Sequence, residues 1–138
     1  MRSGWVIDAT IGVSWVHQKQ STAEAVELLR QSDRGTPIIV PPLWFPEIAN
    51  VLLVLQRRGV LSPDERKSGL RAIANMHLTV DDIPAHTALG VSSDLAETHG
   101  LTVYDATYLE AAIRHGLGLA TRDAALQRAA KACGVPTL

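Results

Sequence analysis

The sequence predicts a three-layer α/β/α sandwich whose central sheet is mostly parallel and has about five strands. Short apolar runs bounded by Gly, Pro or Asp alternate along the chain with longer segments in which apolar residues recur about every 3.6 positions. Strands that alternate with helices are joined by right-handed crossovers, which place helices on both faces of a parallel sheet. No linker, repeat or low-complexity tract divides the chain, so we expect a single domain over residues 1–138.

The N-terminal half is expected to contain two strands and three helices. The apolar runs at residues 5–7 and 38–40 end at Asp and Pro, as buried strands do. One helix is predicted from the capping box that opens at Ser21, and another from the capping box that opens at Ser62, where proline follows at the first helical position. A further helix is expected over residues 44–58.

The C-terminal half continues the alternation. Strands are expected over 78–83, 101–103, 117–120 and, in a final apolar run, 135–138. Helices are expected over 84–98, 104–115 and 122–133. Glycines follow four of the predicted helices of the chain, where C-terminal stops belong: Gly59, Gly100, Gly116 and Gly134.

Composition excludes several classes of protein. The chain carries 13 Lys and Arg against 14 Asp and Glu, a net charge of −1, which argues against wholesale electrostatic binding to nucleic acid or to an anionic membrane. It has one cysteine, Cys133, so no internal disulfide forms. No apolar stretch approaches bilayer length or the core of a signal peptide, and we therefore expect a cytoplasmic location and no membrane partner. The motifs of P-loop enzymes, dinucleotide enzymes, serine hydrolases and zincins are absent from the sequence.

Four acidic residues are predicted to gather at one edge of the sheet. Asp8 ends the first strand, Glu47 begins a helix, and Asp105 and Asp123 each follow a predicted strand at the start of the next helix. In a parallel sheet, functional groups collect beyond the carboxyl ends of the strands. Asn50 lies three residues after Glu47 and therefore shares its helix face.

Each acid also has a structural explanation, because Asp and Glu are favoured at helix N-termini. Asp123 fits the role of an N-cap best, and Asp8, which ends an apolar strand, fits it least. Four ionised carboxylates at one place would repel unless some are protonated or a cation lies among them. An all-oxygen set selects Mg²⁺ or Mn²⁺, and such a site typically acts on phosphate, so we expect phosphodiester hydrolysis.

Four segments of the sequence resemble the motifs of PIN-domain ribonucleases, and more narrowly those of VapC toxins from bacterial toxin–antitoxin pairs. The resemblance lies in register over nearly the whole chain. Its motifs are VIDAT at 6–10, PLWFPEIANVL at 42–52, HGLTVYDATYLEAA at 99–112 and LATRDAAL at 119–126.

The resemblance implies a PIN-like fold and a metal-dependent endoribonuclease that acts as a type II toxin. Asp8, Glu47, Asp105 and Asp123 would hold one or two Mg²⁺ or Mn²⁺ ions and carry catalysis, with Thr10, Thr121 and Asn50 in support. It also implies an RNA substrate, a homodimer and a cognate antitoxin.

Two further surfaces are suggested by the residues themselves. Arg122 lies between Thr121 and Asp123, and we expect it to contact RNA. The helix that begins at Trp44 is apolar around much of its circumference, which indicates either a partner surface or burial within the domain.

Two rival functions remain open at this point. A metal-dependent phosphatase of haloacid-dehalogenase-like type also begins from an aspartate after the first strand, but it needs a second aspartate where this chain has Thr10. A non-catalytic α/β protein-binding module would use the Asp81–Asp82 pair, which comes too late in the chain for a first-strand acidic pocket.

Overall fold

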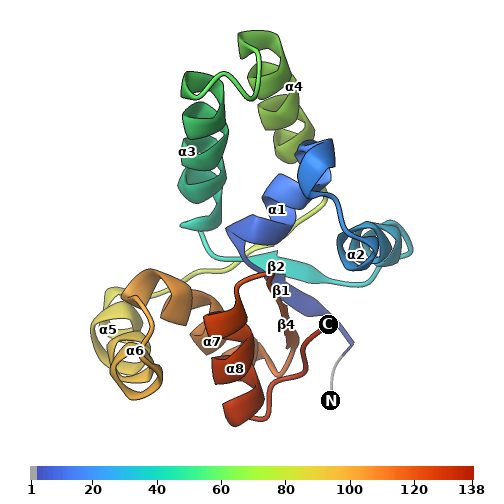
Figure 1. Ribbon diagram of the computed structural model, residues 1–138. Coiled ribbons are helices and arrows are strands. Elements are labelled where there is room, and N and C mark those ends of the chain that lie inside the picture. The colour runs from blue at the N-terminus through green and yellow to red at the C-terminus, as the bar shows by residue number, and fades with distance from the viewer. Residues whose placement is uncertain (1–2) are drawn as a thin grey trace.

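The computed structural model describes residues 3–138 and shows a parallel sheet between two layers of helices (Figure 1). The strands are β1 (Trp5–Ile7), β2 (Ile38–Val40), β3 (Thr79–Val80) and β4 (Gly118–Ala120), in the order β3-β2-β1-β4. All neighbouring strands are parallel. The expected fold class is therefore confirmed, with four strands in the described residues where about five were expected. The C-terminal run contributes a single parallel bridge, between Thr137 and Leu119, instead of a strand.

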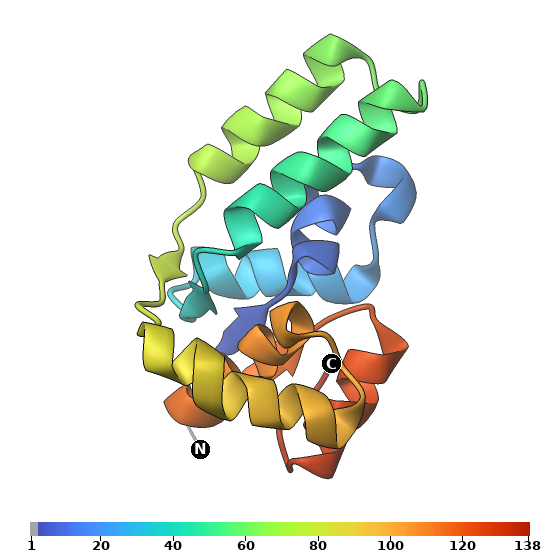
Figure 2. The ribbon, with the colours of Figure 1, turned by 90° about the vertical axis from the view of Figure 1, so that its left-hand side faces the viewer.

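Helices α1 to α4 lie on one side of the sheet, and α5 to α8 lie on the other (Figure 1). Helices α3 and α4 form an antiparallel pair that extends away from the sheet (Figure 2). The helices are α1 (Ala9–Val16), α2 (Ala23–Asp33), α3 (Trp44–Arg57), α4 (Pro63–Ala74), α5 (Ala85–Thr87), α6 (Ser93–His99), α7 (Val103–His115) and α8 (Ala124–Ala132). A 3₁₀ turn, η1 (Gln18–Gln20), follows α1, and a π turn, η2 (Ala88–Ser92), joins α5 to α6.

The helix ends follow the sequence signals closely. Ser62 and Glu65 form the predicted capping box of α4. The cap of α2 is Thr22, whose hydroxyl accepts from the Ala25 amide, and the box expected at Ser21 is wrong by one residue. Gly116 ends α7 with φ +66°, a left-handed conformation that a side chain would strain.

Three segments differ from the prediction. Residues 101–103 form no strand, because Gly100 ends α6 and Thr102 already caps α7 two residues later. The helix predicted over 84–98 is interrupted by the π turn η2. Helix α1 was not predicted, since its sequence, ATIGVSWV, carries no charged residue and therefore no charged face marks the helical period.

Buried apolar side chains pack on both faces of the sheet, and on the face covered by α1 and α3 a glycine sets the separation of these two helices. A Cβ atom at Gly12 would come within 2.7 Å of the Trp44 ring and would also collide with the Ile48 side chain. This close approach holds the start of α3 next to the start of α1, and it thereby fixes the segment that carries Glu47 beside Asp8.

A network of ion pairs connects Asp81, which follows the edge strand β3, to helix α7. Arg114 binds both oxygens of the buried Asp81 carboxylate and, through Nε, the buried Glu110 carboxylate at 2.9 Å. The side chain of His115 lies 2.8 Å from the same Asp81. Asp81 is thus occupied by structural contacts, which argues against the binding-module function suggested for the Asp81–Asp82 pair.

Among the described residues, no helix has the length and apolar character needed to cross a bilayer.

Candidate functional site

Asp8 is the most buried of the four acids and caps helix α1. Its Oδ1 accepts from the Thr10 amide at 3.0 Å, the Thr10 hydroxyl at 2.5 Å and the Ile11 amide at 3.4 Å. Burial nevertheless raises the pKa of the Asp8 carboxyl from its ordinary 3.8 to about 6, because loss of hydration outweighs these hydrogen bonds. Asp8 is therefore an N-cap, the role that the sequence argued against, and also a carboxylate whose charge costs free energy.

Two threonine hydroxyls connect Asp8 with the β4–α8 turn. The Thr121 hydroxyl donates to Asp8 Oδ2 and accepts from the Asp123 amide at 3.0 Å. The Thr10 hydroxyl, which donates to Asp8 Oδ1, accepts from the Arg122 amide at 2.9 Å. The threonines expected to support the site thus set the position of the turn relative to Asp8.

Glu47 lies in the first turn of α3 and is only partly exposed. Its Oε1 accepts a 2.5 Å hydrogen bond from the buried hydroxyl of Tyr108 on α7. Burial raises the pKa of the Glu47 carboxyl, and the charge of Asp105 raises it further, although the bond from Tyr108 opposes both effects.

Asp105 lies in the first turn of α7, and Asp123 caps α8. Burial raises the pKa of Asp105, with a further contribution from the charge of Asp123. Asp123 is exposed, and its Oδ1 accepts from the Leu126 amide at 2.8 Å. Asp105 therefore interacts electrostatically with Glu47 on one side and with Asp123 on the other.

The remaining predicted residues lie at the border of this acidic site. Asn50 is exposed on the next turn of α3. Arg122 is exposed, but its Nη1 donates to the Gln20 carbonyl at 2.8 Å and lies 3.3 Å from the Ser14 hydroxyl. The protein thus holds one edge of the guanidinium group next to a 340 Å³ cavity lined by Thr10, Gln20, Arg122 and Asp123.

Two aromatic partners of the acids were missed by sequence reasoning. The Trp44 indole donates to the Asp8 carbonyl at 2.9 Å, and Tyr108 donates to Glu47. Trp44 is fully buried, so it cannot belong to the partner surface considered for this helix. The partners are 36 and 61 residues apart in the chain, and the only local signal was their presence within two of the quoted motifs.

The donor chemistry of the four acids fits a hard divalent cation. All are carboxylates, and Glu47 and Asp123 each use one oxygen in a hydrogen bond within the chain, which leaves the other for a ligand. Raised pKa values at Asp8, Glu47 and Asp105 show that negative charge here is costly in the absence of a cation. In residues 3–138, no three Asp, Glu, His or Cys side chains lie close enough to hold an ion as they stand. Binding of one ion by three of the acids at once would therefore require side-chain rotation.

Comparison with known proteins gives a consistent result for the fold. The family model of the PIN domain matches residues 5–132. Among solved structures, PAE2754 from Pyrobaculum aerophilum is 23% identical with a TM-score of 0.71, covering 99% of this chain and 90% of that one. FitAcB from Neisseria gonorrhoeae is 17% identical with a TM-score of 0.65, covering 97% of this chain and 96% of that one. No sequence among curated proteins is significantly similar to the chain.

Proposed function

The chain belongs to the PIN domain family, whose members are generally metal-dependent nucleases, and we propose that it is an Mg²⁺- or Mn²⁺-dependent endoribonuclease. The observation that carries the proposal is the group of acids from α1, α3, α7 and α8. Three of them have raised pKa values, and within the described residues no Lys, Arg or His forms an ion pair with any of the four. An uncompensated negative charge of this kind is expected where a cation binds.

Asp8, Glu47, Asp105 and Asp123 would hold the ion or ions. A bound divalent cation would supply an activated water and neutralise charge on the phosphate. Thr10 and Thr121 keep Asp8 and the Asp123 turn together, as described above. Because one edge of Arg122 is already held by Gln20, the other edge is restricted in orientation, and we assign it to an RNA phosphate beside Asp123.

The direct test is RNA cleavage with and without the metal. Purified protein is expected to cleave structured RNA in Mg²⁺ or Mn²⁺ and to lose this activity in EDTA, because no Lys, Arg or His side chain within residues 3–138 forms an ion pair with the four carboxylates. Cleavage that EDTA leaves unchanged would contradict the proposal. Release of phosphate from small monoesters, without cleavage of RNA, would favour the phosphatase instead.

We also assign the protein the role of toxin in a type II toxin–antitoxin pair, acting in the cytoplasm as a homodimer that a cognate antitoxin binds. The motif resemblance supports this assignment. Trp44 is buried, but other apolar side chains are exposed and available for association. Leu89 is 82% exposed in η2, and Phe45 is 36% exposed on α3.

Association is open to a simple measurement. Light scattering is expected to give twice the 14.9 kDa mass of one chain. Co-expression with the neighbouring genes is expected to yield a complex with a small protein that inhibits RNA cleavage. A strict monomer at high concentration, together with neighbouring gene products that neither bind nor inhibit, would remove both assignments and leave the nuclease proposal standing.

A further inference from the structure

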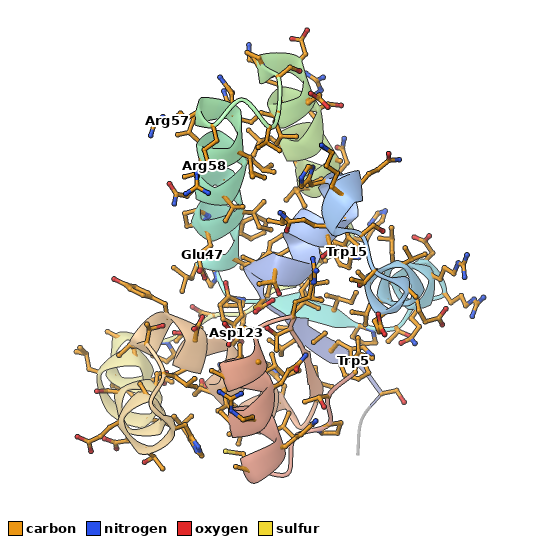
Figure 3. The ribbon with its side chains drawn as sticks, viewed as in Figure 1. Trp5, Trp15, Glu47, Arg57, Arg58 and Asp123 are labelled. Carbon is orange, nitrogen blue, oxygen red and sulfur yellow. The ribbon has the colours of Figure 1, made fainter. Side chains whose placement is uncertain are left out.

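Tyr108 and Glu47 form a hydrogen bond between two helices on opposite sides of the sheet. Tyr108 is on α7, its side chain is 1% exposed, and its hydroxyl lies 2.5 Å from Glu47 Oε1 on α3. Figure 3 shows Glu47 at the end of α3 nearest the sheet, with Arg57 and Arg58 at the far end. The bond therefore connects the two helical layers at the acidic site.

The Tyr108 hydroxyl is the donor in its hydrogen bond to Glu47 Oε1, and the tyrosine side chain around it is buried. A buried phenol requires a hydrogen-bond partner, and here that partner is a carboxylate of the site instead of a backbone carbonyl.

The position of Tyr108 on α7 adds a second connection. Asp105 lies three residues earlier and therefore on the same side of the helix, one turn away. Within the described residues, Tyr108 is the one group that donates a hydrogen bond to the Glu47 carboxylate. The same helix thus carries one acid of the site and the group that orients another.

We infer that Tyr108 is a positioning residue, which holds the Glu47 carboxylate at a fixed distance from Asp105 so that the two acids can bind the same divalent cation. The inference rests on the proposed function. Tyr108 is fully covered and cannot touch RNA, so it acts only through Glu47. Partners that orient a metal-binding side chain typically contribute about 10- to 100-fold in metal affinity or activity.

The test compares Tyr108→Phe with Tyr104→Phe, which removes the same atom from the exposed tyrosine of the same helix. Phe keeps the buried ring, so the variant is expected to fold, and its melting temperature without metal verifies this. Mn²⁺ affinity is measured from the rise in melting temperature with Mn²⁺ concentration. The kcat and KM for RNA cleavage are measured beside it.

Tyr108→Phe is expected to weaken Mn²⁺ binding and lower kcat by about 10- to 100-fold, with KM for RNA nearly unchanged. Tyr104→Phe is expected to leave Mn²⁺ affinity at the wild-type value. In a Glu47→Gln background, Tyr108→Phe is expected to weaken Mn²⁺ binding no further, because the group that it positions has lost its charge.

Unchanged Mn²⁺ affinity in a folded Tyr108→Phe variant would overturn the inference and leave the proposed function intact. An equal loss in the Glu47→Gln background would also overturn it, because the effect would then arise from the fold and not from Glu47. A wild-type protein that binds Mn²⁺ but cleaves no RNA would contradict the proposed function alone. A wild-type protein that binds no Mn²⁺ would remove both.

Discussion

Replacement of Asp105 by Asn is expected to lower the rate of RNA cleavage about a thousandfold or more, equivalent to about 4 kcal/mol of transition-state stabilisation. Asp105 is the acid that interacts with both Glu47 and Asp123, so its charge is central to the site. The measurement is kcat/KM on a defined RNA with saturating Mn²⁺. Asn has nearly the same size and shape, so the loss would report the charge and not the packing.

Asp94→Asn is the matched control for this variant. Asp94 also lies in the first turn of a helix, α6, but it is exposed, and we expect near wild-type activity after its replacement. If Asp94→Asn and Asp105→Asn lower cleavage to the same extent, then Asp105 serves only the N-terminus of its helix. In that case Asp105 would not be a metal ligand, and the proposed four-carboxylate site would be contradicted.

The sequence predicted the fold best where local signals agree with tertiary structure. The strands at residues 5–7 and 38–40 have the predicted bounds. Each is an apolar triplet that is mostly buried in the sheet and that ends at Asp8 or Pro41. The error at 101–103 arose because three apolar or β-branched residues read as a strand in isolation. In the protein, the Thr102 hydroxyl accepts from the Asp105 amide and begins α7 at Val103 instead.

For the site, the sequence predicted the acids but not the aromatic side chains that hold them in place. The acids could be located because Asp and Glu at the ends of apolar runs are visible in the chain, and the structure places all four at helix starts. The groups that hold them were not visible. A hydrogen bond from Tyr108 to a residue 61 positions away has no local pattern, and a tyrosine inside an apolar helix face reads simply as core.

Asp8 also shows that one residue can be both a helix cap and a candidate functional carboxylate. Its Oδ1 satisfies two backbone amides at the start of α1, which is the structural role of an N-cap. Its pKa is nevertheless raised, so in the metal-free protein the charge opposes folding at neutral pH. The two interpretations therefore differ in what they predict for stability as a function of pH.

Asp8→Asn is expected to become more stable relative to wild type as the pH rises. In the unfolded chain Asp8 has a pKa near 3.8, whereas in the metal-free fold it has a pKa of about 6. Between these values the folded state binds more protons, so the contribution of Asp8 to stability falls as the pH increases. The full cost above pH 6 is about 3 kcal/mol, and the difference between variant and wild type should grow by about 2 kcal/mol from about pH 4 to about pH 7.

The experiment is chemical denaturation of both proteins in EDTA over this pH range, followed by a repeat with Mn²⁺. Asn is also a good N-cap, so the variant should keep the start of α1. A cation that binds only the folded state adds about 2.7 kcal/mol at a hundredfold excess over Kd, and wild type should gain this while Asp8→Asn gains much less. If Asp8→Asn is instead the less stable protein at about pH 7 in EDTA, and Mn²⁺ raises both equally, the hydrogen bonds of Asp8 outweigh its charge and its role is that of a helix cap.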